Sequence, residues 1–128
     1  MATHIVISNN DFIKVDSSFH IDWADKGNAM PALSDTIHYV IWNNLVGQNE
    51  IQTKDPSTGN MAGNTNLNST SDAVGSTTIS ALLTWAETRK GEMETAQAAY
   101  ISAVADDEAN ATTNAAGKTW RDYDPNYS

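Results

Sequence analysis

The chain has 128 residues, enough for one domain with a modest core and too few for two ordinary ones. Its formal net charge of −9 argues against a nucleic-acid partner and against an anionic membrane surface, because phosphates require clustered Lys and Arg. Cysteine is absent, which excludes a disulfide framework, a thiolate metal site and a Cys nucleophile. The first residues show no signal segment and no stretch is apolar enough to span a membrane, so we expect a soluble protein.

The first 54 residues predict a small antiparallel β-sheet. Residues 4–8 and 11–15 read as a hairpin, because the intervening Asn9-Asn10 tolerates the positive φ of a tight turn. A third alternating run, residues 19–23, predicts a half-buried strand. Residues 34–54 then predict a second hairpin that organises the domain.

The segment Ile37 to Trp42 is the densest β-former in the chain. Alternation places Tyr39 and Ile41 on one face of this strand and Val40 and Trp42 on the other. Both faces therefore carry apolar side chains. This pattern predicts an inner strand that is covered on both sides.

Residues 55–77 are rich in Asn, Ser, Thr and Gly and predict an extended linker that cannot offset its ordering entropy by burial. Residues 78–109 predict one long helix that runs through Gly91, since Gly in a helix costs only about 1 kcal/mol relative to Ala. The predicted fold class is therefore α+β, with a sheet domain at 1–54, the linker, the helix and a polar tail at 110–128.

The predicted helix has one narrow, Ala-rich apolar seam. It consists of Ile79, Leu82, Ala86, Arg89, Met93, Ala96, Tyr100 and Ala103. Most of the strongly apolar residues lie before residue 52, so the second half of the chain cannot build a core alone. We expect its seam, including Met93 and Tyr100, to pack against a partner chain in a trimeric or hetero-oligomeric assembly.

The polar tail ends in three aromatic residues, Trp120, Tyr123 and Tyr127, interleaved with Arg121. These residue types are enriched among interface anchors. One interpretation is that a mobile tail docks onto a partner through these four residues. The other, of equal weight, is that the aromatic side chains fold back onto the protein's own sheet.

No catalytic or cofactor motif stands out. His4, His20 and His38 all lie in predicted strands, and scattered strand histidines do not supply the three or four converging ligands that a zinc site needs. There is no glycine-rich phosphate loop and no nucleophile elbow. We therefore expect a protein that is not an enzyme and uses no metal or other cofactor.

The order of features resembles that of small tail proteins of tailed bacteriophages, encoded beside tail-fibre genes and including fibre-assembly chaperones. The resemblance rests on four short features: the first hairpin, ending near Val15; the Ile-His-Tyr-Val-Ile-Trp segment at 37–42; the reversal Gly47-Gln-Asn-Glu-Ile51; and the helix start at Leu82-Leu-Thr-Trp85. It covers roughly residues 4–54 and 78–105. The long polar linker and the aromatic tail depart from the family pattern.

This resemblance implies a non-enzymatic protein that assists assembly of a trimeric tail-fibre protein and can remain bound to it. Its expected locations are the virion tail and, during assembly, the host cytoplasm. The alternative is a receptor- or carbohydrate-binding module of the tail. Such a module would need exposed aromatic platforms beside Asp and Asn, for which Trp23 and Trp120 are the candidates.

Overall fold

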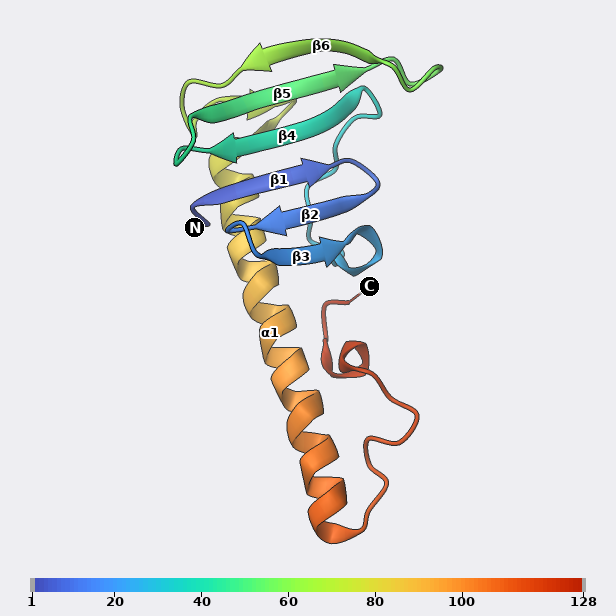
Figure 1. Cartoon of the computed structure of the whole chain (residues 1–128). Helices are drawn as coiled ribbons and strands as arrows, with labels where there is room; N and C mark the ends of the chain where they lie inside the picture. Colours follow the sequence, from blue (N-terminus) through green and yellow to red (C-terminus); the bar gives the residue numbers. More distant parts are fainter. Residues whose placement is uncertain (1, 128) are drawn as a thin grey trace.

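A computed structural model describes residues 2–127. Its largest part is a six-stranded antiparallel sheet, which lies in front of a long helix in Figure 1. The strands are β1 (His4–Ser8), β2 (Phe12–Val15), β3 (Phe19–Asp22), β4 (Ile37–Asn43), β5 (Gln48–Lys54) and β6 (Met61–Asn66), in the order β3-β2-β1-β4-β5-β6. The predicted class, an N-terminal sheet followed by one helix, is confirmed.

The sheet extends beyond the predicted boundary at residue 54. The segment expected to be an unstructured linker contains β6 and a small hairpin of β7 (Ala73–Val74) and β8 (Thr77–Thr78). Asp55 starts the reversal into β6, since its carboxylate accepts hydrogen bonds from the Ser57 N–H and hydroxyl at 2.9 and 2.7 Å. The linker prediction was wrong because an edge strand is held by backbone pairing and does not need apolar side chains.

The helix α1 spans Ile79–Asn110 without a break at Gly91, as predicted. Thr78 caps it, accepting a hydrogen bond from the Ala81 N–H at 3.1 Å. The helix ends where Ala111 adopts the left-handed conformation, with φ of 53°. A short 3-10 turn, η1 (Trp23–Asp25), follows β3, so the strand predicted to reach Trp23 ends one residue earlier.

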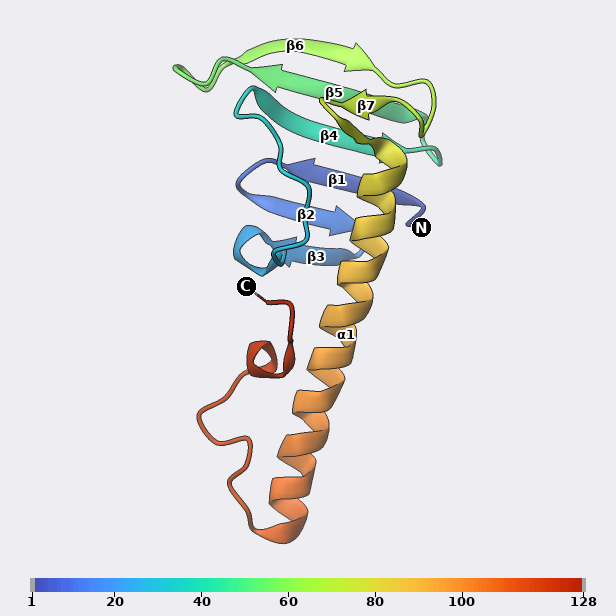
Figure 2. The same ribbon diagram turned by 180° about the vertical axis from the view of Figure 1, so that it is seen from behind.

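The core lies between the sheet and the first half of α1. Figure 2 shows the helix crossing one face of the sheet, which is here called the inner face. The fully buried side chains of the core come from both layers. They are Ile5, Ile7, Ile13, Val15, Ile21 and Val40 from the strands and Ile79, Leu82, Leu83 and Ala86 from the helix. The N-terminus is tied to the same layer, because the Ala2 N–H donates to the Leu83 carbonyl at 3.1 Å.

The first part of the predicted apolar seam of α1 is covered by the chain itself. From Ile79 to Ala96 each of its six residues is buried. The chain's own sheet and tail thus cover this part of the seam. Tyr100 and Ala103 are only partly covered, and packing of the helix against a partner chain stays a prediction.

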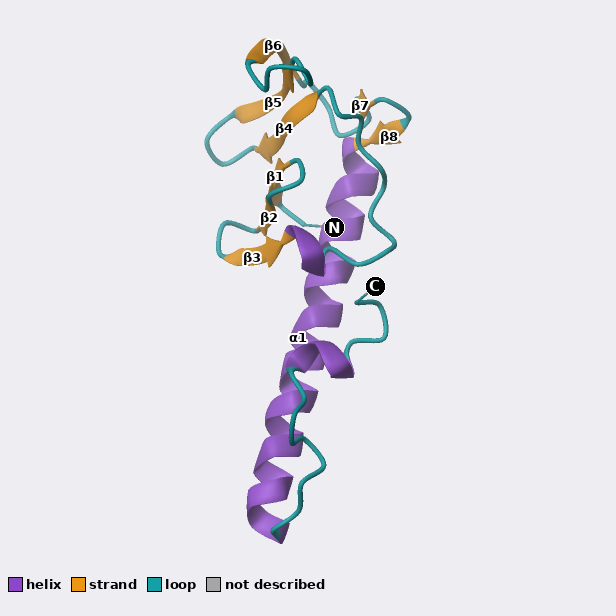
Figure 3. Ribbon diagram, turned by 90° about the vertical axis from the view of Figure 1, so that its right-hand side faces the viewer, coloured by secondary structure: helices purple, strands orange, loops and turns teal. Residues whose placement is uncertain are grey.

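The second half of α1 projects beyond the sheet, and the chain returns beside it (Figures 1 and 3). A second 3-10 turn, η2 (Trp120–Tyr123), lies in this returning segment. The C-terminus comes back to the end of the sheet near β3 (Figure 1). On this projecting half Ile101 is 66% exposed.

Candidate functional site: the open sheet face and the C-terminal clamp

The face of the sheet opposite α1, here called the outer face, has no element of residues 2–127 packed over it (Figure 3). β4 is therefore an inner strand with a single covered face, which corrects the expectation of two covered faces. Strand register arranges the outer-face side chains in two cross-strand rows. The rows are His20, Lys14, Val6, Ile41, Glu50 and Asn66, and Asp22, Phe12, Ser8, Tyr39, Gln52 and Asn64.

The centre of the outer face is apolar and aromatic. Val6, Phe12 and Tyr39 are half-buried, and Ile41 is 8% exposed. The Phe12 ring stacks on His20 with centroids 5.4 Å apart. The central patch is thus partly shielded by its neighbours and carries no charge of its own.

Amide side chains surround Glu50 on the β5–β6 side of the outer face. Its carboxylate accepts hydrogen bonds from Gln48 at 2.9 Å, from Gln52 at 3.5 Å and from Asn64. The Gln48 hydrogen bond, followed by those from Asn64 and Gln52, lowers the pKa of Glu50 despite some desolvation. The carboxylate therefore stays ionised and is held in one place.

Beside this network lies a polar hollow of about 390 Å³. It is lined by Gly47, Gln48, Asn49, Glu50, Asn66, Leu67 and Asn68. Amide groups donate and accept hydrogen bonds, and a carboxylate accepts them, so together they can bind and orient a ligand rich in hydroxyl groups. It is more polar than the hollows of comparable size at the far end of α1, beside Tyr123 and beside Tyr127.

A group of four charged residues, three of them buried, fastens the tail to the rest of the protein. Arg89 is 1% exposed, and both its Nη atoms donate to the Asp124 carboxylate, at 3.1 and 2.6 Å. Its Nε donates to the Asp25 carbonyl at 2.9 Å. The Asp25 carboxylate, in turn, accepts two hydrogen bonds from Arg121, at 2.7 and 2.8 Å. These four residues, here called the C-terminal clamp, join η1, α1 and the tail.

The electrostatics of the clamp favour its charged form. Burial alone would raise the pKa of Asp124, but hydrogen bonds from Arg89 and the Asn126 N–H bring it below the ordinary value. Desolvation of Arg89 is likewise outweighed by its bonds to Asp124, which raise the pKa of the guanidinium. Two bidentate guanidinium–carboxylate pairs give this junction a defined geometry.

The turn after η1 fits closely under the tail. Gly27 has φ of 76°, and a Cβ there would come within 2.9 Å of the Asn126 carbonyl and 3.1 Å of Arg89 Nε. Asn126 also donates to Glu92 on the helix at 2.6 Å. Glycine is therefore required at position 27 both by its backbone conformation and by space.

The tail residues predicted as partner anchors contact the protein itself. The guanidinium carbon of Arg121 lies over the rings of Trp120 and Tyr127, at 4.8 and 5.8 Å from their centroids. The ring centroids of Tyr123 and Tyr100 are 6.0 Å apart. The expectation of a mobile tail was wrong, because Asp25 and Arg89 form a buried anchor for it. The fold-back interpretation holds with α1 and η1 as the main support, and binding of a partner by these residues stays a prediction.

Two other predicted site residues have limited access. Met93 is 3% exposed within the core, so in this conformation it offers no surface to a partner. Trp23 and Trp120 are half-buried against the core, and each has a cation near its ring, Lys26 at 5.2 Å and Arg121 at 4.8 Å. Glycan binding through these two rings stays a prediction.

The histidines do not converge. His4 is buried, and its Nδ1 has no hydrogen-bond partner in the described part of the chain. His20 pairs with Asp22 at 3.0 Å on the outer face, and His38 packs against Tyr39. Across residues 2–127 no three His, Asp or Glu side chains are placed to hold a metal ion.

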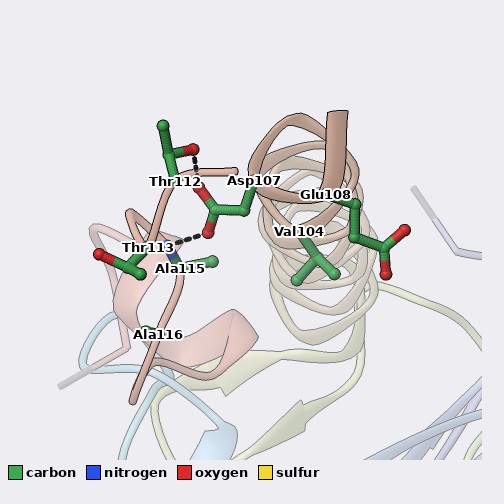
Figure 4. Close-up of a pocket in the computed structure, with 7 residues that line it drawn as sticks. All are labelled: Val104, Asp107, Glu108, Thr112, Thr113, Ala115 and Ala116. Atoms are coloured by element: carbon green, nitrogen blue, oxygen red, sulfur yellow. Dashed lines mark hydrogen bonds between the residues drawn. The ribbon is translucent and has the colours of Figure 1, made fainter. Parts of the chain in front are cut away.

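A further hollow of about 290 Å³ lies at the far end of α1 (Figure 4). Asp107 dominates it, and both carboxylate oxygens are used: one accepts from the Thr112 hydroxyl and the Asn114 N–H, the other from the Ala115 N–H at 2.7 Å. These bonds close the loop that turns the chain back. We read this hollow as a structural loop closure.

Comparison with protein-family models, with curated proteins and with solved structures gave no match for this chain. Within residues 2–127 no helix combines the length and the apolar character needed to cross a membrane. Sequence reasoning missed the clamp, because Asp25, Arg89 and Asp124 look like ordinary surface charges. The one available signal was Arg89, a cation in the apolar seam of the predicted helix.

Proposed function

We propose that this protein is a non-enzymatic tail-fibre-associated protein of a tailed bacteriophage. It assists assembly of a trimeric fibre through the outer face of its sheet and can remain bound to the fibre. It acts in the host cytoplasm during assembly and in the virion tail afterwards. The observation that supports this proposal is the outer face itself, an apolar and aromatic patch over which none of the described elements packs.

A trimeric fibre built of β-strands presents a folding problem that an assembly factor can relieve. Interwoven β-structure folds slowly, because its contacts are distant in sequence, and it exposes strand edges and apolar surface on the way. An uncovered face with an uncharged centre, Val6, Phe12, Tyr39 and Ile41, can shield such surface temporarily or permanently. This face is built on paired strands whose other side packs against the core, so little backbone ordering is needed on binding.

Co-expression of the fibre with and without this protein tests the proposal. The protein should raise the yield of soluble trimeric fibre, and Tyr39→Ser together with Phe12→Ser should remove that gain. Ile101→Ser is the matched control, since it removes an exposed apolar side chain far from the outer face. Melting curves of all variants show whether the sheet is still folded, and Trp42→Ala serves as the unfolded reference, at a cost of about 3 to 5 kcal/mol.

Equal fibre yield in the presence and absence of the protein would contradict the proposal. So would an equal loss of yield in the Ile101→Ser control. A protein that binds the finished fibre without changing its yield would be a structural component and not an assembly factor.

The polar hollow beside Glu50 favours a second candidate function, a receptor- or carbohydrate-binding role. Its amide groups, including Asn66 and Asn68, match the hydroxyl groups of a sugar better than the half-buried Trp23 and Trp120 do. Titration of the isolated protein with a panel of oligosaccharides, followed by amide NMR, tests this role. Shifts confined to residues 47–50 and 66–68 would support it, and no shift at millimolar sugar would exclude it.

A further inference from the structure

The two edges of the sheet differ in their protection. β3 is a four-residue strand that carries His20 and Asp22 and runs directly into η1. β6 has six residues, Met-Ala-Gly-Asn-Thr-Asn, and pairs only with β5 within residues 2–127. Natural edge strands are usually blunted by charges, proline, bulges or short length. β6 has one register irregularity at its start, before Gly63, and residues 63–66 carry none of these features. In Figure 1 it forms the free upper border of the sheet.

The backbone groups that face this border can be assigned from the register. The Leu67 N–H donates to the Asn49 carbonyl at 2.8 Å. Hydrogen-bonded pairs alternate along an antiparallel ladder, so Thr65 and Gly63 also direct their backbone groups toward β5. The N–H and C=O groups of Asn64 and Asn66 consequently point away from the sheet, toward the free edge.

We propose that β6 pairs antiparallel with β6 of a second copy of this chain, giving a dimer with one continuous twelve-stranded sheet. The register that uses the regular part of the strand, residues 63–66, centres on Asn64 opposite Asn64 of the second copy. Asn64 already donates its side-chain amide to Glu50. Its side-chain oxygen is left to accept a hydrogen bond from the facing Asn64.

The distribution of charge favours a second copy of this chain as the partner of the β6 edge. Each chain has a net charge of −9, so most surfaces of two copies repel each other. Residues 59–71 contain no charged residue, and antiparallel self-pairing there brings no like charges opposite one another. This edge is the part of the sheet where two identical chains can approach closely.

Sedimentation velocity of the full chain over a rising concentration series tests the proposal. A single edge contact is small, so the dimer should form progressively with concentration. Asn64→Lys sets two cations opposite each other, and Asn64→Pro removes an outward N–H. Each should weaken association by about tenfold or more and barely change the melting temperature. Thr65→Pro removes an inward N–H and should instead lower the melting temperature.

His20→Lys is the matched control, because it adds the same charge at the opposite edge of the sheet and should leave the dimer intact. A chain that stays monomeric at the highest concentration overturns the proposal. A dimer that survives both Asn64 variants, or is lost in His20→Lys, overturns it as well. No outcome depends on the fibre, so the failure of this inference and that of the proposed function are separable.

Discussion

The two halves of α1 are held by different physical means. The first half lies on the sheet and buries Ile79, Leu82, Leu83 and Ala86 completely or nearly so. The second half has no sheet beneath it within residues 2–127 and is accompanied by the returning tail. Two ion pairs, the buried Arg89–Asp124 and the part-buried Arg121–Asp25, fasten this tail at Arg89, which lies in the first half of the helix. Apolar burial thus holds the first half of α1 on the sheet. Two guanidinium–carboxylate pairs hold the tail that runs beside the second half.

The difference shows what each kind of contact demands. Apolar burial is non-directional and tolerates substitution by side chains of similar size. A buried ion pair is stable only while both partners are present, because an unpaired charge left behind remains desolvated. Removing one member of the clamp should therefore cost more than the same truncation on the projecting half of the helix.

The largest effect is expected from Arg89→Met. It leaves Asp124 without its guanidinium and the Asp25 carbonyl without its donor, so we expect a loss of about 3 to 5 kcal/mol in the free energy of unfolding. Urea denaturation measures it. Lys90→Ala is the neighbouring control: its 3.9 Å contact with Asp16 is partly exposed and should contribute less than about 1 kcal/mol.

The double variant Arg89→Met with Asp124→Leu checks the reason for that loss. Replacing both charges by apolar groups removes the unpaired carboxylate, so it should recover part of the stability lost in Arg89→Met. A double variant that is less stable than the single one would show that the pair stabilises the fold directly.

Truncation of one aliphatic side chain to Ala in each half of α1, Leu82→Ala and Ile101→Ala, compares how much each half contributes to the free energy of unfolding. Leu82 is fully buried against the sheet, so we expect a loss of about 2 to 5 kcal/mol. Ile101 is 66% exposed, and its truncation should stay within about 0.5 kcal/mol. Thermal or urea unfolding of both variants measures the difference. Comparable losses would mean that the projecting half of the helix is buried against another chain.

The predictable parts of the fold are those where side-chain pattern and backbone requirement agree. Alternation in residues 4–15, 19–23 and 37–42, together with the Asn9-Asn10 turn, locates four strands, and apolar spacing locates the helix and its continuity through Gly91. β6 escaped prediction because its side chains are polar and exposed. Its position depends on pairing with β5, and sequence patterning does not report that pairing.

The site was less predictable than the fold. The tail aromatics were recognised as contact residues, but their contacts lie within the chain. Asp25 is 64 residues from Arg89 and 96 from Arg121 along the chain, and no local pattern links them. Only the fold of η1 and the tail against α1 brings these charges together.

The two ends of α1 give the smaller effects. At the sheet end Thr78→Ala removes the acceptor for the Ala81 N–H, at a cost of about 1 kcal/mol. Thr84→Ala is the control, because this exposed residue lies inside the helix and Ala there should be neutral or slightly stabilising. Urea denaturation separates the two. Equal effects would show that capping contributes nothing at this end.

At the far end the smallest effect is expected, and it depends on pH. The Ala115 N–H, the Thr112 hydroxyl and the Asn114 N–H lower the pKa of Asp107 below its ordinary value of 3.8. A lowered pKa means that the loop closure is fully present above that value and is lost as the pH falls through the pKa of the folded state. Amide exchange at Asn114 and Ala115 should therefore speed up, relative to the intrinsic rate, only in acid. Asp107→Asn should show reduced protection already at neutral pH while α1 before Ala96 stays protected, and unchanged protection of both amides in that variant would contradict the role given to the carboxylate.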